Sequence, residues 1–242
     1  MRYKCIVSYD GTNYFGFQIQ GDLKTIELEI INAIKKAFNY ETKIYASGRT
    51  DKEVHAIGQV FHFDMDIDVE PTSVKRALNS FLPDDIYIKS VEIVNEDFHA
   101  RFSAKEKEYR YYINVKEYDP LKIHYMPYMN YLDIKLMEEA IHLFEGTHDF
   151  KGFASAQIDP RKDTIKTIFE TKVNVLDDSV EFIFRGTAFL KYQVRRMMGL
   201  LIDIGRGYYK KEKILEVLEK KDPKISHRVA PGCGLYLYKV TY

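Results

Sequence analysis

The order of the secondary-structure elements that the sequence predicts constrains this chain most, because one order occurs twice. In each half, the spacing of apolar residues predicts strand, helix, strand, strand, helix and strand, with insertions. The first half is expected to contain strands at residues 3–9, 43–46, 58–63 and 86–94, and helices at 26–38 (behind a Thr25 cap) and 73–81. The second half is expected to contain strands at 108–115, 168–175, 180–184 and 235–240, and helices at 134–144 (behind Asp133), 190–204 and 211–220.

The repeated order is that of the ferredoxin-like βαββαβ unit. We therefore expect an α+β fold of two ferredoxin-like halves, at residues 1–104 and 105–242, whose antiparallel sheets lie side by side. Helices would cover one face of the sheets, and an active-site cleft would lie on the other. The chain has 242 residues, 45% of them hydrophobic, which is enough apolar surface for a sizeable core.

Composition excludes several classes of protein. Basic and acidic residues number 36 each, so the molecule has no net field that attracts a polyanion, and a nucleic-acid site must be a local patch. Cys5 and Cys233 are too few for a disulfide framework. His55, His99 and His148 lack ligand spacing, so we expect no metal site. No apolar run approaches the roughly 20 residues of a membrane span, and the N-terminus lacks a signal-peptide core. We expect a soluble, cytoplasmic protein without a membrane partner.

A basic patch lies within residues 185–211. It contains one acidic residue, Asp203, and seven basic residues: Arg185, Lys191, Arg195, Arg196, Arg206, Lys210 and Lys211. At about 100° per residue, Lys191, Arg195 and Arg206 fall on one arc beside the apolar stripe of the predicted 190–204 helix. Such a face is either simply solvated or binds phosphates. The interleaved tyrosines favour nucleic acid because aromatic rings stack on bases; they are Tyr192, Tyr208 and Tyr209.

The polar segment at residues 46–56 lies between two predicted apolar strands. It could be a simple turn, with Gly48 supplying an unusual backbone angle and Asp51 hydrogen-bonding the backbone around it. Alternatively, Arg49 lies close to Asp51, where a guanidinium lowers the pKa of the carboxyl group and keeps it ionised. Asp51 would then act as a nucleophile, and Arg49 could hold a phosphate or insert into a base stack.

Six sequence motifs occur in order along nearly the whole chain. They are YDGT and YFGFQ at residues 9–12 and 14–18; GRTD, VHA and QV at 48–51, 54–56 and 59–60; FHARFSA and YRYY at 98–104 and 109–112; HDF at 148–150 with Phe153; Phe189 with Val194, Arg195, Met198 and Gly199; and Ala230, Pro231 with Gly234, Leu235, Tyr236. Together they resemble the motifs of the tRNA pseudouridine synthase A (TruA) family. Each motif alone is weak, but six in order are specific.

The resemblance implies an isomerase that converts uridine in tRNA to pseudouridine without a cofactor. By the same resemblance, Asp51 is the nucleophile, and Arg49 enters the space that the flipped-out base vacates. Tyr109 would stack on that base and help to remove its C5 proton, and Leu235 would line the pocket. The expected phosphate contacts are Arg101, Lys191, Arg195 and Arg206, with Arg195 also a potential partner of Asp51.

The family also implies a homodimer and a target uridine on the 3′ side of the anticodon stem-loop, at tRNA positions 38 to 40. The residues leave open whether the carboxylate attacks the sugar or acts as the base that starts an elimination there. Two residues depart from the family pattern. Phe17 stands where the family usually has Trp, and Glu53 stands where it usually has Gly.

Two other functions fit parts of the sequence. The YDGT motif resembles the Asp-x-Asp-Gly-Thr loop of phospho-aspartate hydrolases, but Ser8 stands in place of their nucleophile, which excludes that class. The closer alternative is an RNA-binding protein that has lost catalysis, or a synthase that acts on other uridines. The presence of Arg49, Asp51 and Tyr109 together argues against lost catalysis, but it identifies no particular target.

Overall fold

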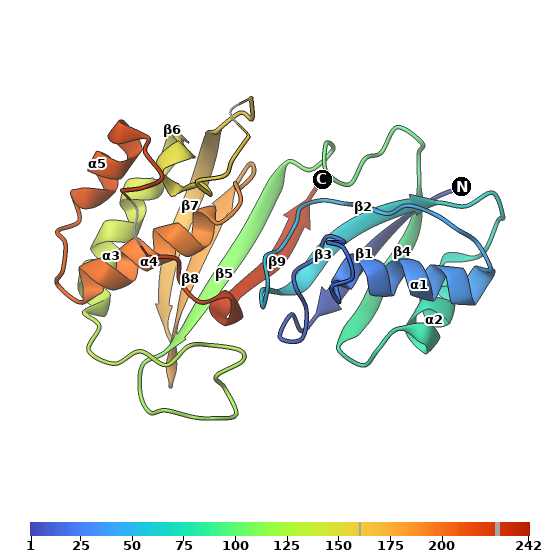
Figure 1. Cartoon of the computed structure of the whole chain (residues 1–242), viewed down its shortest axis with the longest axis horizontal. Coiled ribbons are helices and arrows are strands. Elements are labelled where there is room, and N and C mark those ends of the chain that lie inside the picture. The colour runs from blue at the N-terminus through green and yellow to red at the C-terminus, as the bar shows by residue number, and fades with distance from the viewer. Residues whose placement is uncertain (160, 226–227) are drawn as a thin grey trace. The chain divides into compact units, whose positions relative to one another are not determined.

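The chain forms two compact units in a computed structural model that describes residues 1–159, 161–225 and 228–242. The first unit contains residues 1–105 together with the C-terminal residues 236–242, and the second contains residues 106–235. Figure 1 colours the chain from its N-terminus to its C-terminus and labels the helices and strands.

The first unit is built on β1 (Arg2–Tyr9), which pairs antiparallel with β3 (His55–Asp64) on one side and β4 (Ile86–Val94) on the other. The short β2 (Tyr45–Ala46) pairs antiparallel with β3, and β9 (Leu235–Thr241) pairs parallel with it. Alternate residues of β1 are buried, as expected of a strand with one face on a core. They are Tyr3, Cys5, Val7 and Tyr9.

Two helices complete the core of the first unit. Helix α1 (Ile26–Phe38) packs on α2 (Pro71–Phe81), and α2 packs on β4 (Figure 1). The buried residues of each helix recur at intervals of three and four, which places them on one stripe. They are Ile26, Ile30, Ala33 and Ile34 in α1, and Val74 and Leu78 in α2.

The second unit has an antiparallel sheet in the order β5, β8, β7, β6. These strands are β5 (Glu106–Asn114), β6 (Gly146–Asp149), β7 (Ile165–Val175) and β8 (Ser179–Gly186). The helices are α3 (Ile134–Ile141), α4 (Gln193–Gly205) and α5 (Lys213–Lys220), with 3₁₀ turns at His142–Phe144, Phe150–Phe153 and Gly232–Gly234. Its core contains five fully buried phenylalanines: Phe144, Phe150, Phe153, Phe182 and Phe184.

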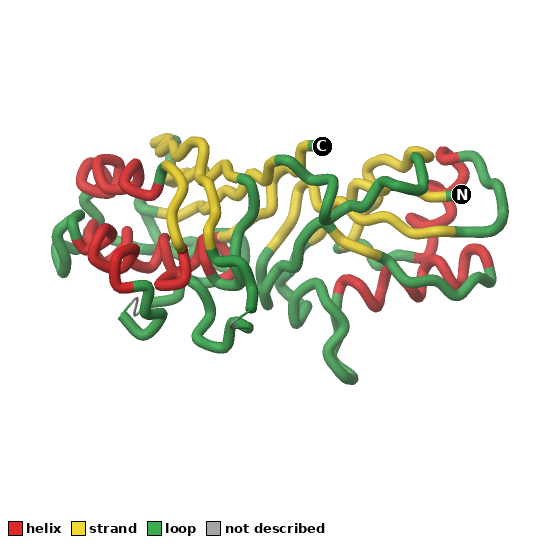
Figure 2. Tube along the Cα trace, turned by 90° about the horizontal axis from the view of Figure 1, so that it is seen from above, coloured by secondary structure: helices red, strands yellow, loops and turns green. Residues whose placement is uncertain are grey.

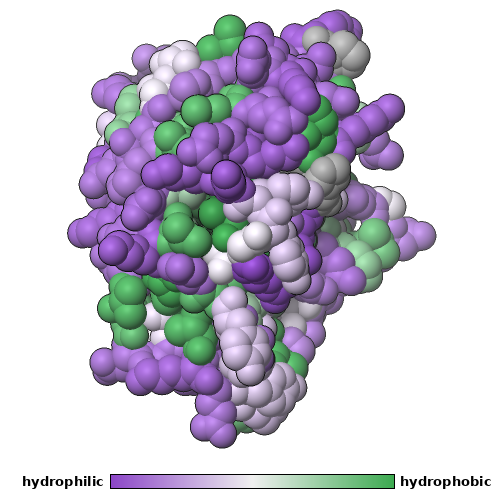
Figure 3. Space-filling view, turned by 90° about the vertical axis from the view of Figure 1, so that its left-hand side faces the viewer, coloured by the Kyte–Doolittle hydropathy of each residue, from purple (hydrophilic) through white to green (hydrophobic). Residues whose placement is uncertain are grey.

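The side of the molecule in Figure 3 is mainly hydrophilic, with hydrophobic residues in separate areas. Scattered apolar residues of this kind are ordinary on a folded surface. Within the ranges that the structure describes, no helix combines the length and apolar character needed to span a membrane.

The predicted elements are present, and two have the predicted bounds: the helix at Ile26–Phe38 and the strand at Ile86–Val94. The predicted 190–204 helix is wrong at its start. It begins at Gln193, because Tyr192 has a left-handed backbone (φ +67°) and the Gln193 N–H closes a turn on the Leu190 carbonyl. Lys191 therefore precedes the helix. The predicted 134–144 helix tightens into a 3₁₀ turn after Ile141.

The two predicted helix caps differ. The side chain of Asp133 accepts a hydrogen bond from the Leu136 N–H, so it caps α3 as predicted. Thr25 occupies the N-cap position of α1, but its side chain makes no capping bond. The predicted Thr25 cap is wrong because the hydroxyl is buried and has no partner among the residues that the structure describes.

We predict that Asp133→Ala lowers the free energy of unfolding by about 1 kcal/mol, because it removes a capping bond of 3.0 Å. Thr25→Val is the matched control at the start of α1. It replaces an unpartnered buried hydroxyl with a methyl group of similar shape, so the free energy of unfolding should stay the same or rise. Urea unfolding of both variants measures the difference. Equal losses in the two variants would contradict this account of the caps.

Candidate active site

The loop that carries Asp51 joins β2 to β3 and is held by the long loop that follows β1; both are green in Figure 2. The Phe17 N–H donates to the Thr50 carbonyl at 3.1 Å, and the Glu53 N–H donates to the Tyr14 carbonyl at 3.4 Å. Gly16 (φ +92°) makes this approach possible, since a Cβ there would lie 2.7 Å from the Thr50 carbonyl oxygen. The two loops are therefore in direct main-chain contact.

Asp51 begins a four-residue turn, because the Val54 N–H donates to its carbonyl at 3.2 Å. The third residue of this turn is Glu53, with φ +65°. Glycine is favoured at such a position. The turn thus keeps a left-handed residue although the chain supplies Glu. The Glu53 carboxylate lies 3.6 Å from the Lys52 ammonium.

Arg49 and Asp51 lie on the same loop but in different surroundings. Asp51 is half-buried, whereas Arg49 is exposed. In the described part of the chain, the Arg49 guanidinium forms no hydrogen bond or ion pair, so it does not hold the Asp51 carboxylate. Arg49 is accessible to a ligand that reaches this loop.

His55, the first residue of β3, helps to fix the loop that follows β1. Its Nδ1 accepts a hydrogen bond from the Gly11 N–H at 3.0 Å and lies 3.2 Å from an Asp10 carboxylate oxygen. The ring stacks on Tyr236, with 4.7 Å between ring centroids. These contacts indicate that the buried His55 has a structural role. Among the residues that the structure describes, no group of His, Cys, Asp and Glu side chains could hold a metal ion.

The second unit carries Tyr109 and Leu235, both almost fully buried. Tyr109 lies on β5 opposite Phe184, and its ring meets the Phe189 ring edge-on with 5.1 Å between centroids; the residue is 8% exposed. Leu235 follows the Gly232–Gly234 turn and is 5% exposed.

Lys191 and Arg195 both lie close to one aromatic ring at the start of α4. The Lys191 ammonium lies 5.2 Å from the centroid of the Tyr192 ring, and the Arg195 guanidinium lies 5.4 Å from it. Arg195 Nε also donates to the Ala230 carbonyl at 2.8 Å, and the Ala230 N–H donates to the Arg195 carbonyl at 2.9 Å. Two cations beside an aromatic face suit a nucleotide phosphate and its base. Arg206 lies at the other end of the helix, where it is the C-cap.

Besides Arg195, three of the seven basic residues in the predicted patch are held by neighbours within the second unit. Arg185 pairs with Glu106 and Glu170, and Lys211 pairs with Glu139. Arg196 donates to the Pro223 carbonyl, and burial lowers the pKa of its guanidinium. The acidic residue of the patch, Asp203, pairs with Arg228. Much of the predicted basic patch is therefore already engaged by partners within the second unit.

Arg101 belongs to the first unit and lies in the loop between β4 and β5. Its guanidinium lies 5.6 Å from the centroid of the Phe102 ring, which is 76% exposed. The sequence marked Arg101 as a phosphate contact but did not single out Phe102. The signal that could have identified it is a large aromatic residue in a polar loop beside an arginine.

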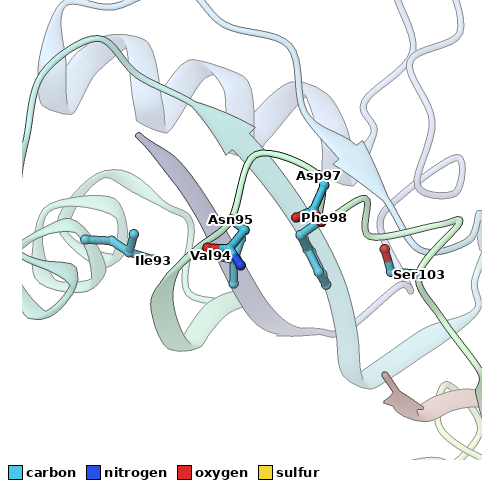
Figure 4. Close-up of a pocket in the computed structure, with 6 residues that line it drawn as sticks. All are labelled: Ile93, Val94, Asn95, Asp97, Phe98 and Ser103. Atoms are coloured by element: carbon cyan, nitrogen blue, oxygen red, sulfur yellow. The ribbon is translucent and has the colours of Figure 1, made fainter.

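A shallow surface pocket lies elsewhere in the first unit (Figure 4). Its lining residues are Ile93, Val94, Asn95, Asp97, Phe98 and Ser103. Val94 pairs with Arg2 at one end of β1, whereas Ala56, next to the Asp51 loop, pairs with Tyr9 at the other end. The pocket therefore lies a full strand length from Asp51 and is not part of the candidate active site.

Comparison with known proteins gives consistent results. The family model described as tRNA pseudouridine synthase matches residues 5–103 and 140–242. The proteins named tRNA pseudouridine synthase A from Exiguobacterium sp. and Geobacillus sp. are each 43% identical over all of this chain and 98% of their own length. The protein of that name from Oceanobacillus iheyensis is 42% identical over all of this chain and 96% of its length. These matches show that the chain belongs to the tRNA pseudouridine synthase A family of isomerases.

Proposed function

We propose that this isomerase converts uridines of the tRNA anticodon stem-loop, at positions 38 to 40, to pseudouridine, with Asp51 as the nucleophile. The observation that carries the proposal is the placement of Asp51 at the start of a turn that main-chain bonds hold on both sides. A fixed carboxylate can attack the sugar or remove a proton from it without first being ordered, which lowers the cost of reaching the transition state.

The chemistry needs no oxidant and no added group. The bond between C1′ of the ribose and N1 of the uracil breaks, the base rotates, and a bond from C1′ to C5 forms. The C5 proton leaves, and N1 gains a proton. The Asp51 carboxylate acts on the sugar in the first step, either as nucleophile or as base, and water must be kept from the detached intermediate.

The base must leave the RNA stack before Asp51 can reach its sugar, at a cost of a few kcal/mol. Arg49 is exposed beside Asp51, so its planar guanidinium can fill the vacated place in the stack. In our proposal Tyr109 stacks on the flipped base and assists removal of the C5 proton, and Leu235 contacts the base. Both side chains are almost fully buried, which favours a fixed pocket wall.

We propose that Lys191, Arg195 and Arg206 contact tRNA phosphates, with Arg101 as a further contact. The pair of cations beside the Tyr192 ring supports the first two, because an aromatic face and a positive charge together suit a nucleotide. The ion pair between Asp203 and Arg228 also supports phosphate binding on this helix, because an unpaired carboxylate there would repel phosphate.

The finer architecture is also a proposal. We infer two ferredoxin-like halves, at 1–104 and 105–242, with helices on one face and the active-site cleft on the other. The C-terminal strand β9 of the second half pairs with β3, which is why residues 236–242 group with the first unit. The strand order β4, β1, β3, β2 in the first unit supports a ferredoxin-like first half, because the split βαβ motif gives this order. By family analogy we propose a homodimer, and a tRNA substrate implies that the enzyme acts in the cytoplasm.

We predict that Asp51→Asn lowers the rate of pseudouridine formation at least ~10³-fold, because loss of a nucleophile removes most of the catalysed rate. The dissociation constant for tRNA should change by less than about three-fold, since the neutral amide of Asn has nearly the same size and shape as the carboxylate that it replaces. Mapping of pseudouridine by chemical labelling and mass spectrometry measures the first effect, and filter binding measures the second. Asp68→Asn, at an exposed position of the same unit, is the control. If Asp51→Asn keeps full activity, Asp51 is not the nucleophile. If the natural protein binds tRNA but forms no pseudouridine, it is an RNA-binding protein and not a synthase.

We predict that the double variant Arg195→Gln and Arg206→Gln weakens tRNA binding and flattens its salt dependence, by about 0.7 to 0.9 units of slope per lost phosphate contact. Titrations at several salt concentrations measure the slope. The matched control is Lys35→Gln with Lys36→Gln, which removes two exposed charges from α1 and should leave the slope unchanged. If the salt dependence of binding has the same slope in the Arg double variant and in the natural protein, α4 is not part of the RNA-binding surface.

A further inference from the structure

A buried polar network lies directly beneath the loop that carries Asp51. The Tyr9 hydroxyl, on β1, and the Thr50 Oγ1 share a hydrogen bond of 2.8 Å. Tyr9 is 5% exposed and Thr50 is 7% exposed, so the bond is shielded from water. Burial raises the pKa of the Tyr9 hydroxyl, and its contacts with Thr50 and Gln59 partly offset this rise. The hydroxyl is therefore neutral and able to donate.

A second part of the network holds the start of the same loop. Gln59, a fully buried residue of β3, accepts from the Ser47 hydroxyl at 2.7 Å and donates to the Gly48 carbonyl at 2.8 Å. The side-chain oxygen of Gln59 also accepts from the Val60 N–H at 3.1 Å. Buried polar groups are costly to leave without partners, so this arrangement resists any shift of Ser47 and Gly48.

The two sets of hydrogen bonds, one made by Gln59 and one by Tyr9, act as two clamps on the loop and explain why buried and exposed residues alternate along it. Ser47 and Gly48 are tied to Gln59, and Thr50 is tied to Tyr9 and, through its carbonyl, to Phe17. Arg49, between the clamps, is left exposed. Asp51 directly follows Thr50, so the bond between Tyr9 and Thr50 helps to fix the position of the Asp51 backbone, together with the main-chain bonds of the loop.

We propose that Tyr9 and Thr50 are positioning residues for Asp51: their shared buried hydrogen bond keeps the carboxylate where it reacts, without either side chain touching the RNA. This inference rests on the proposed role of Asp51 in catalysis. Loss of the bond would leave the fold and the tRNA-binding surface in place but would let the loop sample other positions. A displacement of about 1 Å at a reacting group can lower a rate ~10²-fold.

The test compares the single-turnover rate and the KM for tRNA in four variants. Tyr9→Phe and Thr50→Val each remove one partner of the bond and should lower the rate about 10- to 100-fold, with KM within about three-fold of the natural value. Thr50→Ser keeps the hydroxyl and should retain the rate within about three-fold. The double variant Tyr9→Phe and Thr50→Val should be no slower than the slower single variant, within about three-fold, because both changes remove the same bond.

Tyr3→Phe is the matched control for loss of a buried tyrosine hydroxyl. Tyr3 lies on the same face of β1 at its other end, donates to the Val69 carbonyl and accepts from the Val69 N–H, each at 2.9 Å. Its variant should lose a similar amount of thermal stability but keep the natural rate. The rate loss would then be specific to the bond under Asp51.

Asp51→Asn in the same assay separates the two claims. If Asp51→Asn is inactive while Tyr9→Phe and Thr50→Val react as fast as Tyr3→Phe, the positioning role is wrong and the proposed function stands. If Thr50→Ser is as slow as Thr50→Val, the hydroxyl is not what matters, and the positioning role is again wrong. If Asp51→Asn retains full activity, both the proposed function and this inference fail.

Discussion

The main-chain contact between the loop after β1 and the loop after β2 is the constraint on which the rest of the candidate site depends. It brings the Phe17 N–H to the Thr50 carbonyl and the Glu53 N–H to the Tyr14 carbonyl. Such an approach requires glycine: a Cβ at Gly11 would lie 2.1 Å from the Val54 carbonyl oxygen, and one at Gly16 would lie 2.7 Å from that of Thr50. The YDGT and YFGFQ motifs therefore serve the loop that carries Asp51, although they lie about 40 residues before it.

Long elements with strong periodicity could be predicted from the sequence, and short or strained ones could not. Helix α1 and strand β4 have the predicted bounds because their apolar residues follow one period throughout. The start of α4 could not be predicted, since a tyrosine in a left-handed conformation leaves no pattern. The four-residue β6 and the 3₁₀ turn after it are shorter than a period can reveal. Thr25 has the residue type of a cap, but packing of the first unit buries its hydroxyl instead.

The candidate site shows the same division between local and long-range information. Arg49 and Asp51 are recognisable because their motif is local. The extent of the basic patch could not be recognised from the sequence, because the carboxylates that pair with Arg185 come from β5 and β7. Gln59 belongs to one of the six motifs, but its hydrogen bonds to Ser47 and Gly48 are visible only in the structure. Ion pairs and buried networks join residues far apart in sequence, so single-sequence patterns do not report them.

The central claim is that a carboxylate held in a fixed loop isomerises uridine in tRNA without a metal or cofactor. Release of tritium from tRNA labelled at uridine C5, measured in EDTA alongside the pseudouridine content of the same tRNA, tests it most directly. The account predicts one tritium released for each pseudouridine formed, at a rate that EDTA does not change, from tRNA whose chain stays intact. Binding of a broad tRNA pool without any tritium release, or release that stops when EDTA is added, would contradict it.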